Sequence, residues 1–318
     1  MRRKRSKVVI IGAGLVGSAT AFSLITQSVC DDVVLIDKDN KRAKAEAMDL
    51  QNCIEYLNRN AKITSGGYDS CSDADIVVIT AAAPYVKGQT RLDMLEHSAG
   101  IVRSVVLSVM KSGFDGLFLL ITNPVDVLSY YAYRLSGLPK SQIIGTGTAL
   151  DSARLKNILA DVIHVDPRSI HAFSMGEHGD SQMIPWSRLY IGGKSFFDIL
   201  KDNRKIEEAI NLVDVHRKTV NLGWEIAGGK GATNYGIATT TVGIIKAVLF
   251  DENKVIPVSA LLTGEYGEKD VFAGVPAVIN RDGVKEVVEI TMTPDEKEEF
   301  KKSVDVIRST ITKLNCNG

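Results

Sequence analysis

The sequence predicts an α/β protein with a doubly wound parallel sheet in its first half and an α+β domain in its second. Four short, continuous apolar runs in the first half have the length and β-branched content of strands that are buried on both faces. They lie at 8–11, 33–36, 76–80 and 117–122. Longer amphipathic stretches separate them and predict helices at 15–29, 41–57 and 92–112. Such alternation of strand and helix is typical of a parallel sheet.

The second half has a less regular pattern, which begins near residue 145. Its expected helices lie at 150–162, 206–227 and 238–249, and its expected strands at 170–174, 187–191, 255–263 and 271–279. A glycine-rich break is expected at 228–231. A last helix has the clearest start signal, because Thr293 and Glu296 form a capping box and Pro294 follows the cap. We therefore expect two closely packed domains, 1–145 and 146–318.

Composition excludes several classes of function. The 318 residues include 38 basic and 38 acidic side chains, so bulk charge suggests neither nucleic-acid nor membrane binding. The basic cluster at 2–7 is interpreted as a solvated arm before the first strand, and no apolar run of about 18 residues could span a membrane. The four cysteines, Cys30, Cys53, Cys71 and Cys316, show no paired spacing. We therefore expect no metal site, no disulfide framework and a reducing cytoplasm.

A glycine-rich turn follows the first expected strand and opens the first expected helix. Gly12, Gly14 and Gly17 have the spacing G-x-G-x-x-G, which in this context indicates a Rossmann-type dinucleotide site. Asp37 ends the second strand, where a carboxylate hydrogen-bonds an adenosine ribose and repels a 2′-phosphate. Taken alone, Asp37 would equally well cap the next helix. Together with the glycines it predicts NAD, rather than NADP, as the cofactor.

Four further segments make the sequence resemble the L-lactate/malate dehydrogenase family along nearly its whole length. They are GQTRL at 88–92, ITNP at 121–124, TALDSAR at 148–154 and MGEHGDS at 175–181. The resemblance implies an NAD-dependent enzyme that interconverts a small 2-keto acid and an L-2-hydroxy acid. It also implies a homo-oligomer, either a tetramer or a dimer.

The resemblance also implies roles for four charged or titratable residues. His178 would give a proton to the ketone, since imidazole titrates near neutral pH, and Asp151 would orient and stabilise it. Arg154 lies three residues after Asp151 on one helix face and would bind the substrate carboxylate with its planar guanidinium. Arg91 would polarise the ketone when its loop closes. Singly, these residues would be a loop histidine, a helix-start residue and surface cations.

Three other positions would complete the pocket. Asn123 would add a hydrogen bond near the ketone oxygen or the nicotinamide ribose, although a plain turn before Pro124 is the alternative. Thr233 and Ile237 would form a wall of the substrate and nicotinamide pocket. For an isolated isoleucine, core packing is the better interpretation.

The sequence departs from the family at its substrate-discriminating position, which is Tyr85 here. Lactate enzymes place glutamine there, and malate enzymes place an arginine that pairs with the second carboxylate. Without that arginine a malate enzyme is disfavoured, unless Lys87 compensates. Pyruvate and L-lactate are the expected pair, and a larger apolar 2-keto acid is the alternative.

A second departure concerns regulation by fructose 1,6-bisphosphate, which many bacterial members of the family bind at a subunit interface through an arginine and a histidine. His171 matches the histidine, but Lys156 stands at the arginine position, so activation stays open. Two other classes fit the sequence less well. A short-chain dehydrogenase would need Tyr190 and Lys194 on one helix, which the intervening glycines at 192 and 193 oppose. A non-catalytic scaffold protein would be expected to have lost some of the four charged residues.

Overall fold

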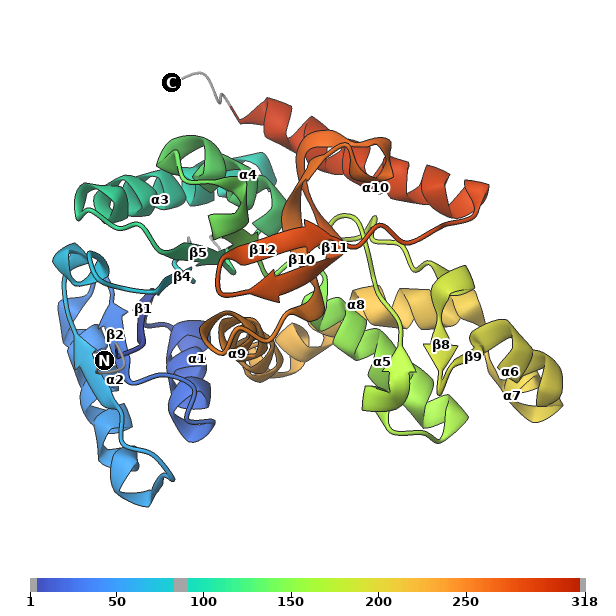
Figure 1. Cartoon of the computed structure of the whole chain (residues 1–318), viewed down its shortest axis with the longest axis horizontal. Helices are drawn as coiled ribbons and strands as arrows, with labels where there is room; N and C mark the ends of the chain where they lie inside the picture. The colour runs from blue at the N-terminus through green and yellow to red at the C-terminus, as the bar shows by residue number, and fades with distance from the viewer. Residues whose placement is uncertain (1–4, 83–90, 315–318) are drawn as a thin grey trace.

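The computed structural model describes residues 5–82 and 91–314. Within this part of the chain, nine strands form one sheet in the order β12-β11-β10-β6-β5-β4-β1-β2-β3 (Figure 1). The first six strands pair in parallel, in the order 3-2-1-4-5-6 that is typical of a Rossmann fold. They are β1 (Lys7–Ile11), β2 (Asp32–Ile36), β3 (Lys62–Ser65), β4 (Ile76–Ile79), β5 (Leu117–Leu120) and β6 (Ile143–Gly145).

The four strands expected in the first half are confirmed, and so are its three helices. In Figure 1, α3 and α4 lie on one face of the sheet, whereas α1 and α9 lie on the other. The helices of this half are α1 (Leu15–Thr26), α2 (Asn40–Asn52), α3 (Arg91–Lys111) and α4 (Val125–Ser136), with short 3-10 turns at Cys53–Tyr56, Tyr68–Cys71 and Lys140–Gln142. The sequence did not predict β3 or α4.

The second half completes the same sheet. Strands β10 (Lys254–Thr263), β11 (Lys269–Asn280) and β12 (Gly283–Val287) are antiparallel to one another, and β10 pairs with β6 through Ser259 and Gly145. The sheet therefore continues across the boundary expected near residue 145. A separate small sheet contains β7 (Ile170–His171), β8 (Tyr190–Ile191) and β9 (Lys194–Ser195).

The helix expected at 206–227 is wrong as one element. It is divided between α7 (Arg204–Ala209) and α8 (Leu212–Lys230), because the Asn211 side chain accepts hydrogen bonds from two backbone N–H groups and starts a new helix. The expected break at 228–231 is also too early, since α8 continues through Gly228 to Lys230 and is followed by Gly231, whose φ is +87°. The strand expected at 187–191 begins instead as a 3-10 turn, Trp186–Arg188, and the one expected at 170–174 ends at His171.

The remaining helices are α5 (Ala149–Ile163), α6 (Phe196–Asp202), α9 (Tyr235–Leu249) and α10 (Pro294–Lys313), with 3-10 turns at Pro167–Ser169 and Glu265–Gly267. The capping box predicted at the start of α10 is confirmed. Phe300, Val304 and Ile307 of α10 are buried in the main hydrophobic core, which lies around the large sheet. Among the described residues, no helix is long and apolar enough to cross a membrane, and no cluster of side chains is arranged to hold a metal ion.

Candidate active site

The glycine-rich turn lies at the carboxyl end of β1, next to β4, where the strand order of the parallel sheet reverses. Gly12 has φ +110°, and a Cβ there would lie 2.5 Å from Thr80 Oγ1. A Cβ on Gly17 would lie 1.8 Å from the Gly12 carbonyl oxygen, so α1 can pack this close to the turn only with glycine. At Gly14, by contrast, a Cβ would meet nothing within 4 Å. The N-terminus of α1, which has no side-chain cap, therefore faces open space.

Asp37 joins the end of β2 to this turn. Its Oδ2 accepts a hydrogen bond from the Ala13 N–H at 2.7 Å, and its Oδ1 accepts one from the Asp39 N–H at 2.9 Å. The residue that caps α2 is Asp39, whose side chain accepts from two N–H groups of that helix. The alternative of a helix-capping role for Asp37 is therefore wrong. The open helix terminus and the adjacent carboxylate fit the pyrophosphate and ribose of a dinucleotide.

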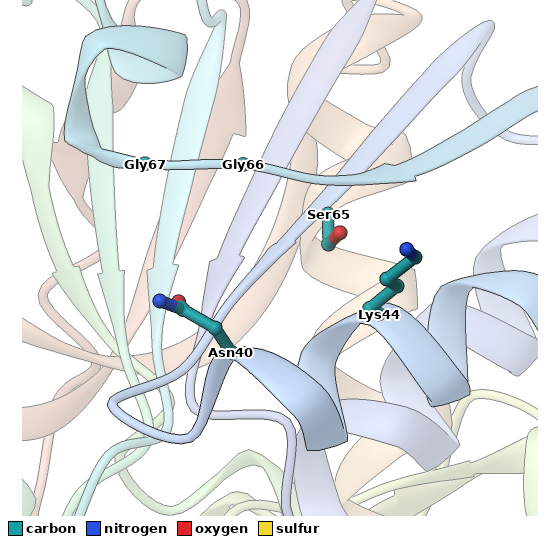
Figure 2. A pocket seen from close by; sticks show the side chains of 5 residues that line it. All are labelled: Asn40, Lys44, Ser65, Gly66 and Gly67. Atoms are coloured by element: carbon teal, nitrogen blue, oxygen red, sulfur yellow. The ribbon is translucent and has the colours of Figure 1, made fainter.

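An open cavity of about 350 Å³ lies near the same edge of the sheet, at the end of β3 and the start of α2. Its lining residues are Asn40, Lys44, Ser65, Gly66 and Gly67. In Figure 2 the side chains of Asn40, Lys44 and Ser65 lie around one hollow, opposite the backbone of the two glycines. Asn40 follows Asp37 by three residues, so the cavity lies beside the segment that connects β2 to α2.

His178, Asp151 and Arg154 form one hydrogen-bonded array in the second half of the chain. The distance from His178 Nδ1 to Asp151 Oδ2 is 2.5 Å, and Arg154 Nη1 donates to Asp151 Oδ1 at 2.8 Å. Asp151 and Arg154 both lie in the first two turns of α5 and on the same face of that helix. The side chains of Asp151 and Arg154 are 1% and 10% exposed, whereas that of His178 is 25% exposed. The imidazole is therefore the part of the array most accessible to a ligand.

The charges of the array hold each other in their ionised forms. Burial opposes ionisation of Asp151, but His178 and Arg154 outweigh it and lower the pKa of the carboxyl below its usual range. Burial also lowers the pKa of His178, yet the Asp151 carboxylate outweighs it, and the net pKa of the imidazole is raised above 6.5. Both shifts favour the ion pair of a protonated imidazole and an ionised carboxylate.

The segment that carries His178, residues 175–183, is fixed from several directions; we call it the histidine loop. Met175 and Met183 close it with two backbone hydrogen bonds, and Gly176 makes two more with Gly274 of β11. Ser303 of α10, which is fully buried, accepts a hydrogen bond from the Glu177 N–H at 2.8 Å. These contacts were not predicted from the sequence, because they join segments that are far apart along the chain.

Two further residues touch the array and were also missed. Asp126 of α4 accepts a hydrogen bond from the backbone N–H of His178 at 2.8 Å. Gly223 of α8 faces Arg154, since a Cβ there would lie 3.2 Å from Nη2 of the guanidinium. The contact of Asp126 could have been suspected from the sequence, because an acidic residue within the apolar run 125–128 is unusual. Nothing in the local sequence indicates the contact of Gly223.

Three other predicted site residues lie outside this hydrogen-bonded array. Asn123 is exposed at the end of β5, directly after Thr122, whose hydroxyl donates to the Ala81 carbonyl at 2.9 Å. Thr233 and Ile237 are half-buried at the start of α9, which approaches α5 where a Cβ on Gly236 would lie 3.1 Å from Leu150. They are close to the start of α5 but not part of the hydrogen-bonded array.

The remaining predicted residues are only partly described. Arg91 is the first residue of α3, and its side chain lies outside the description. Tyr85 and Lys87 fall outside the described residues. His171 is exposed on β7. Lys156 is half-buried with its ammonium 6.0 Å from the centre of the Phe173 ring, and burial, followed by the charge of Lys254, lowers its pKa.

The chain matches known proteins along nearly its whole length. Residues 6–145 match the NAD binding domain of the lactate/malate dehydrogenases, and residues 148–316 match their alpha/beta C-terminal domain. The chain is 50% identical over 308 residues to L-lactate dehydrogenase 3 of Bacillus thuringiensis subsp. konkukian, covering 97% of this chain and 98% of that protein. It is 44% identical over 314 residues to L-lactate dehydrogenase 1 of Bifidobacterium longum, covering 99% and 98%.

Solved structures give the same result. A minor L-lactate dehydrogenase of Enterococcus mundtii in a ligands-bound form superimposes with a TM-score of 0.96 at 42% identity, covering 98% of this chain and 99% of that one. A lactate dehydrogenase from a deep-sea metagenome superimposes with a TM-score of 0.94 at 38% identity, over 98% and 99% of the two chains.

Proposed function

The chain belongs to the lactate/malate dehydrogenase family, and we propose that it is an NAD-dependent L-lactate dehydrogenase that interconverts pyruvate and L-lactate. The observation that carries the proposal is the array of His178, Asp151 and Arg154, in which Asp151 bonds to both of the other side chains. It joins a proton donor, its counter-ion and a carboxylate-binding guanidinium in one buried cluster. The names of relatives that are 44–50% identical over nearly the whole chain support the choice of substrate.

The cofactor supplies the hydride when it is bound. Gly14 and the N-terminus of α1 would hold its pyrophosphate, because no side chain fills the space beside them. Asp37 would hold the adenosine ribose, and its negative charge would exclude a 2′-phosphate. Ile237 would cover one side of the nicotinamide.

His178 would give the proton that the ketone oxygen takes up during reduction. Its Nδ1–H donates to Asp151, so Nε2 is the atom that would donate to the substrate. The raised pKa of the imidazole favours its protonated form, and the lowered pKa of Asp151 favours the carboxylate beside it. In the direction of lactate oxidation, the neutral imidazole would take the proton from the hydroxyl group.

Arg154 would bind the carboxylate of the substrate. Its Nη1 is used by Asp151, which holds the plane of the guanidinium and leaves other N–H donors for a ligand. Arg91 would polarise the ketone oxygen, with Asn123 as a second donor near it. Thr233 would form a wall of the pocket. Tyr85 would stand at the discriminating position, and the absence of arginine there disfavours oxaloacetate.

The test is an NADH absorbance assay with pyruvate, oxaloacetate, 2-ketoisocaproate and phenylpyruvate. We expect pyruvate to be the best substrate, with oxaloacetate the worst. Replacement of His178 by Asn should leave NADH binding intact and reduce turnover by about 10²–10⁴-fold, since a positioned proton donor contributes that much. Wild-type turnover in that variant, or a preference for 2-ketoisocaproate or oxaloacetate, would refute the corresponding part of the proposal.

The assembly and location are also part of the proposal. We propose a cytoplasmic homo-oligomer, a tetramer or a dimer, composed of a dinucleotide domain (1–145) and a substrate domain (146–318). Cys30, Cys53 and Cys71 are free thiols in the described part of the chain. Lys156 and His171 would be the phosphate contacts if fructose 1,6-bisphosphate binds at all. Light scattering with and without fructose 1,6-bisphosphate tests the oligomeric state and whether this ligand changes it. A monomer would contradict the proposed oligomer.

A further inference from the structure

Asp126 is a buried carboxylate that the proposed reaction does not yet use. It lies in the first turn of α4, and only 2% of its surface is exposed. Its Oδ2 accepts the hydrogen bond from the His178 backbone N–H at 2.8 Å, and its Oδ1 accepts one from Ser259 Oγ of β10 at 2.6 Å. Helix α4, strand β10 and the histidine loop therefore meet at this one carboxylate.

A charge at this position is costly, and the hydrogen bonds alone do not require it. Burial raises the pKa of Asp126 to about 6, despite the two hydrogen bonds that favour the ionised form. An asparagine has the same shape: its amide oxygen could accept from His178 N–H, and its NH₂ group could donate to Ser259. It would do so without burying an ion. Holding the histidine loop in place therefore does not by itself explain why a carboxylate, rather than an amide, occupies position 126.

We infer that Asp126 is a positioning residue of the reaction, which fixes the main chain at His178 and provides a second buried negative charge that stabilises the protonated imidazole. The inference rests on the proposed function, in which His178 donates a proton. In this arrangement two carboxylates stabilise the imidazolium of His178. Asp151 does so through a hydrogen bond to the ring, and Asp126 through its negative charge and its hydrogen bond to the backbone N–H.

The charged groups around the two side chains are consistent with this role. Asp126 faces His178 and Glu177 of the histidine loop, and β10 offers it only the Ser259 hydroxyl. Burial is the largest effect on the pKa of His178 and lowers it, but Asp151 of α5 and, after it, Asp126 of α4 raise this pKa. Arg154 of α5 lowers it. Glu177 is a hydrogen-bond acceptor for the Ser181 hydroxyl, at 2.5 Å.

The test is the titration of His178 in the whole enzyme, followed by NMR with labelled histidine. The chain has five histidines, and the His178→Asn variant identifies the signal of His178. In Asp126→Asn, we expect the pKa of His178 to fall by on the order of one unit relative to wild type, because the neighbouring charge is lost and the shape is kept. The high-pH limb of kcat/KM for pyruvate should move down by the same amount.

Two more variants complete the titration experiment. Ser259→Ala removes a hydrogen bond that favours ionised Asp126, so it should shift His178 in the same direction by less; it also serves if Asp126→Asn does not fold. Ser129→Ala is the matched control, because Ser129 is buried one turn along α4 and its hydroxyl has no hydrogen-bond partner among the described residues. It should leave the His178 titration unchanged.

The outcomes separate this inference from the proposed function. If wild type reduces pyruvate and His178→Asn does not, the function stands. If His178 then titrates in Asp126→Asn as in wild type, with turnover lowered equally at every pH, Asp126 is only structural and the inference is overturned. The NMR titration needs no turnover, so it also decides the point if pyruvate is not the substrate.

Discussion

Gly223 of α8 sets how closely the backbone can approach Arg154, and a methyl group there should weaken substrate binding. In Gly223→Ala the Cβ would lie 3.2 Å from Nη2 and 3.3 Å from Nη1 of Arg154, which is tighter than an ordinary contact. The guanidinium must yield by a few tenths of an ångström while Nη1 stays tied to Asp151 at 2.8 Å. A hydrogen bond to a charged group contributes about 1.5–3 kcal/mol. Partial loss of about 1 kcal/mol would raise KM for pyruvate about fivefold.

The assay is steady-state reduction of pyruvate by NADH, with Gly228→Ala as the matched control on the same helix. A Cβ at 228 would meet nothing within 4 Å. Each substitution should stabilise the helix by up to about 1 kcal/mol, because alanine is a better helix former than glycine. Only Gly223→Ala should raise KM, with NADH binding unchanged in both. Equal KM values in the two variants would refute the argument that Arg154 is confined by α8.

The cofactor side gives two further predictions. Asp37→Ser should narrow the preference for NADH over NADPH in kcat/KM, because the charge that repels a 2′-phosphate is gone; an unchanged ratio would remove Asp37 from cofactor selection. Gly17→Ala should lower the free energy of unfolding by about 1–3 kcal/mol, since its Cβ would lie 1.8 Å from the Gly12 oxygen. Gly14→Ala, whose Cβ would enter open space, should keep its urea midpoint but weaken NADH binding; equal loss of stability in both would contradict this distinction.

Sequence pattern predicted the elements whose signal is local. Continuous β-branched runs gave four buried strands, and the capping box at Thr293 gave the start of α10. Strand β3 was missed because its four residues, Lys62–Ser65, alternate too weakly to stand out. Helix α4 was missed because Val125–Ser136 contains β-branched and aromatic residues of low helix propensity, which tertiary packing overrides. The pairing of β10 with β6 joins residues 259 and 145, and no local pattern encodes it.

The candidate site shows the same difference between residues with a local sequence signal and residues whose contacts are long-range. Titratable residues in family-like segments pointed to His178, Asp151 and Arg154, and these side chains do lie in contact; their roles remain proposals. Asp126 and Gly223 were not found, because their importance depends on what folds against them. A buried aspartate within an apolar run is only suggestive, and a glycine in a helix has several ordinary explanations.

The arrangement of the sheet explains why the site depends on the whole chain. The carboxyl ends of β1, β2 and β5 supply the glycine turn, Asp37 and Asn123, and the residues after β6 supply α5 with Asp151 and Arg154. The histidine loop makes no part of that parallel sheet. It is held against it by Asp126 of α4, Gly274 of β11 and Ser303 of α10. The position of His178 beside Asp151 therefore depends on the packing of β11 and α10 against the histidine loop, as well as on the parallel sheet that carries α5.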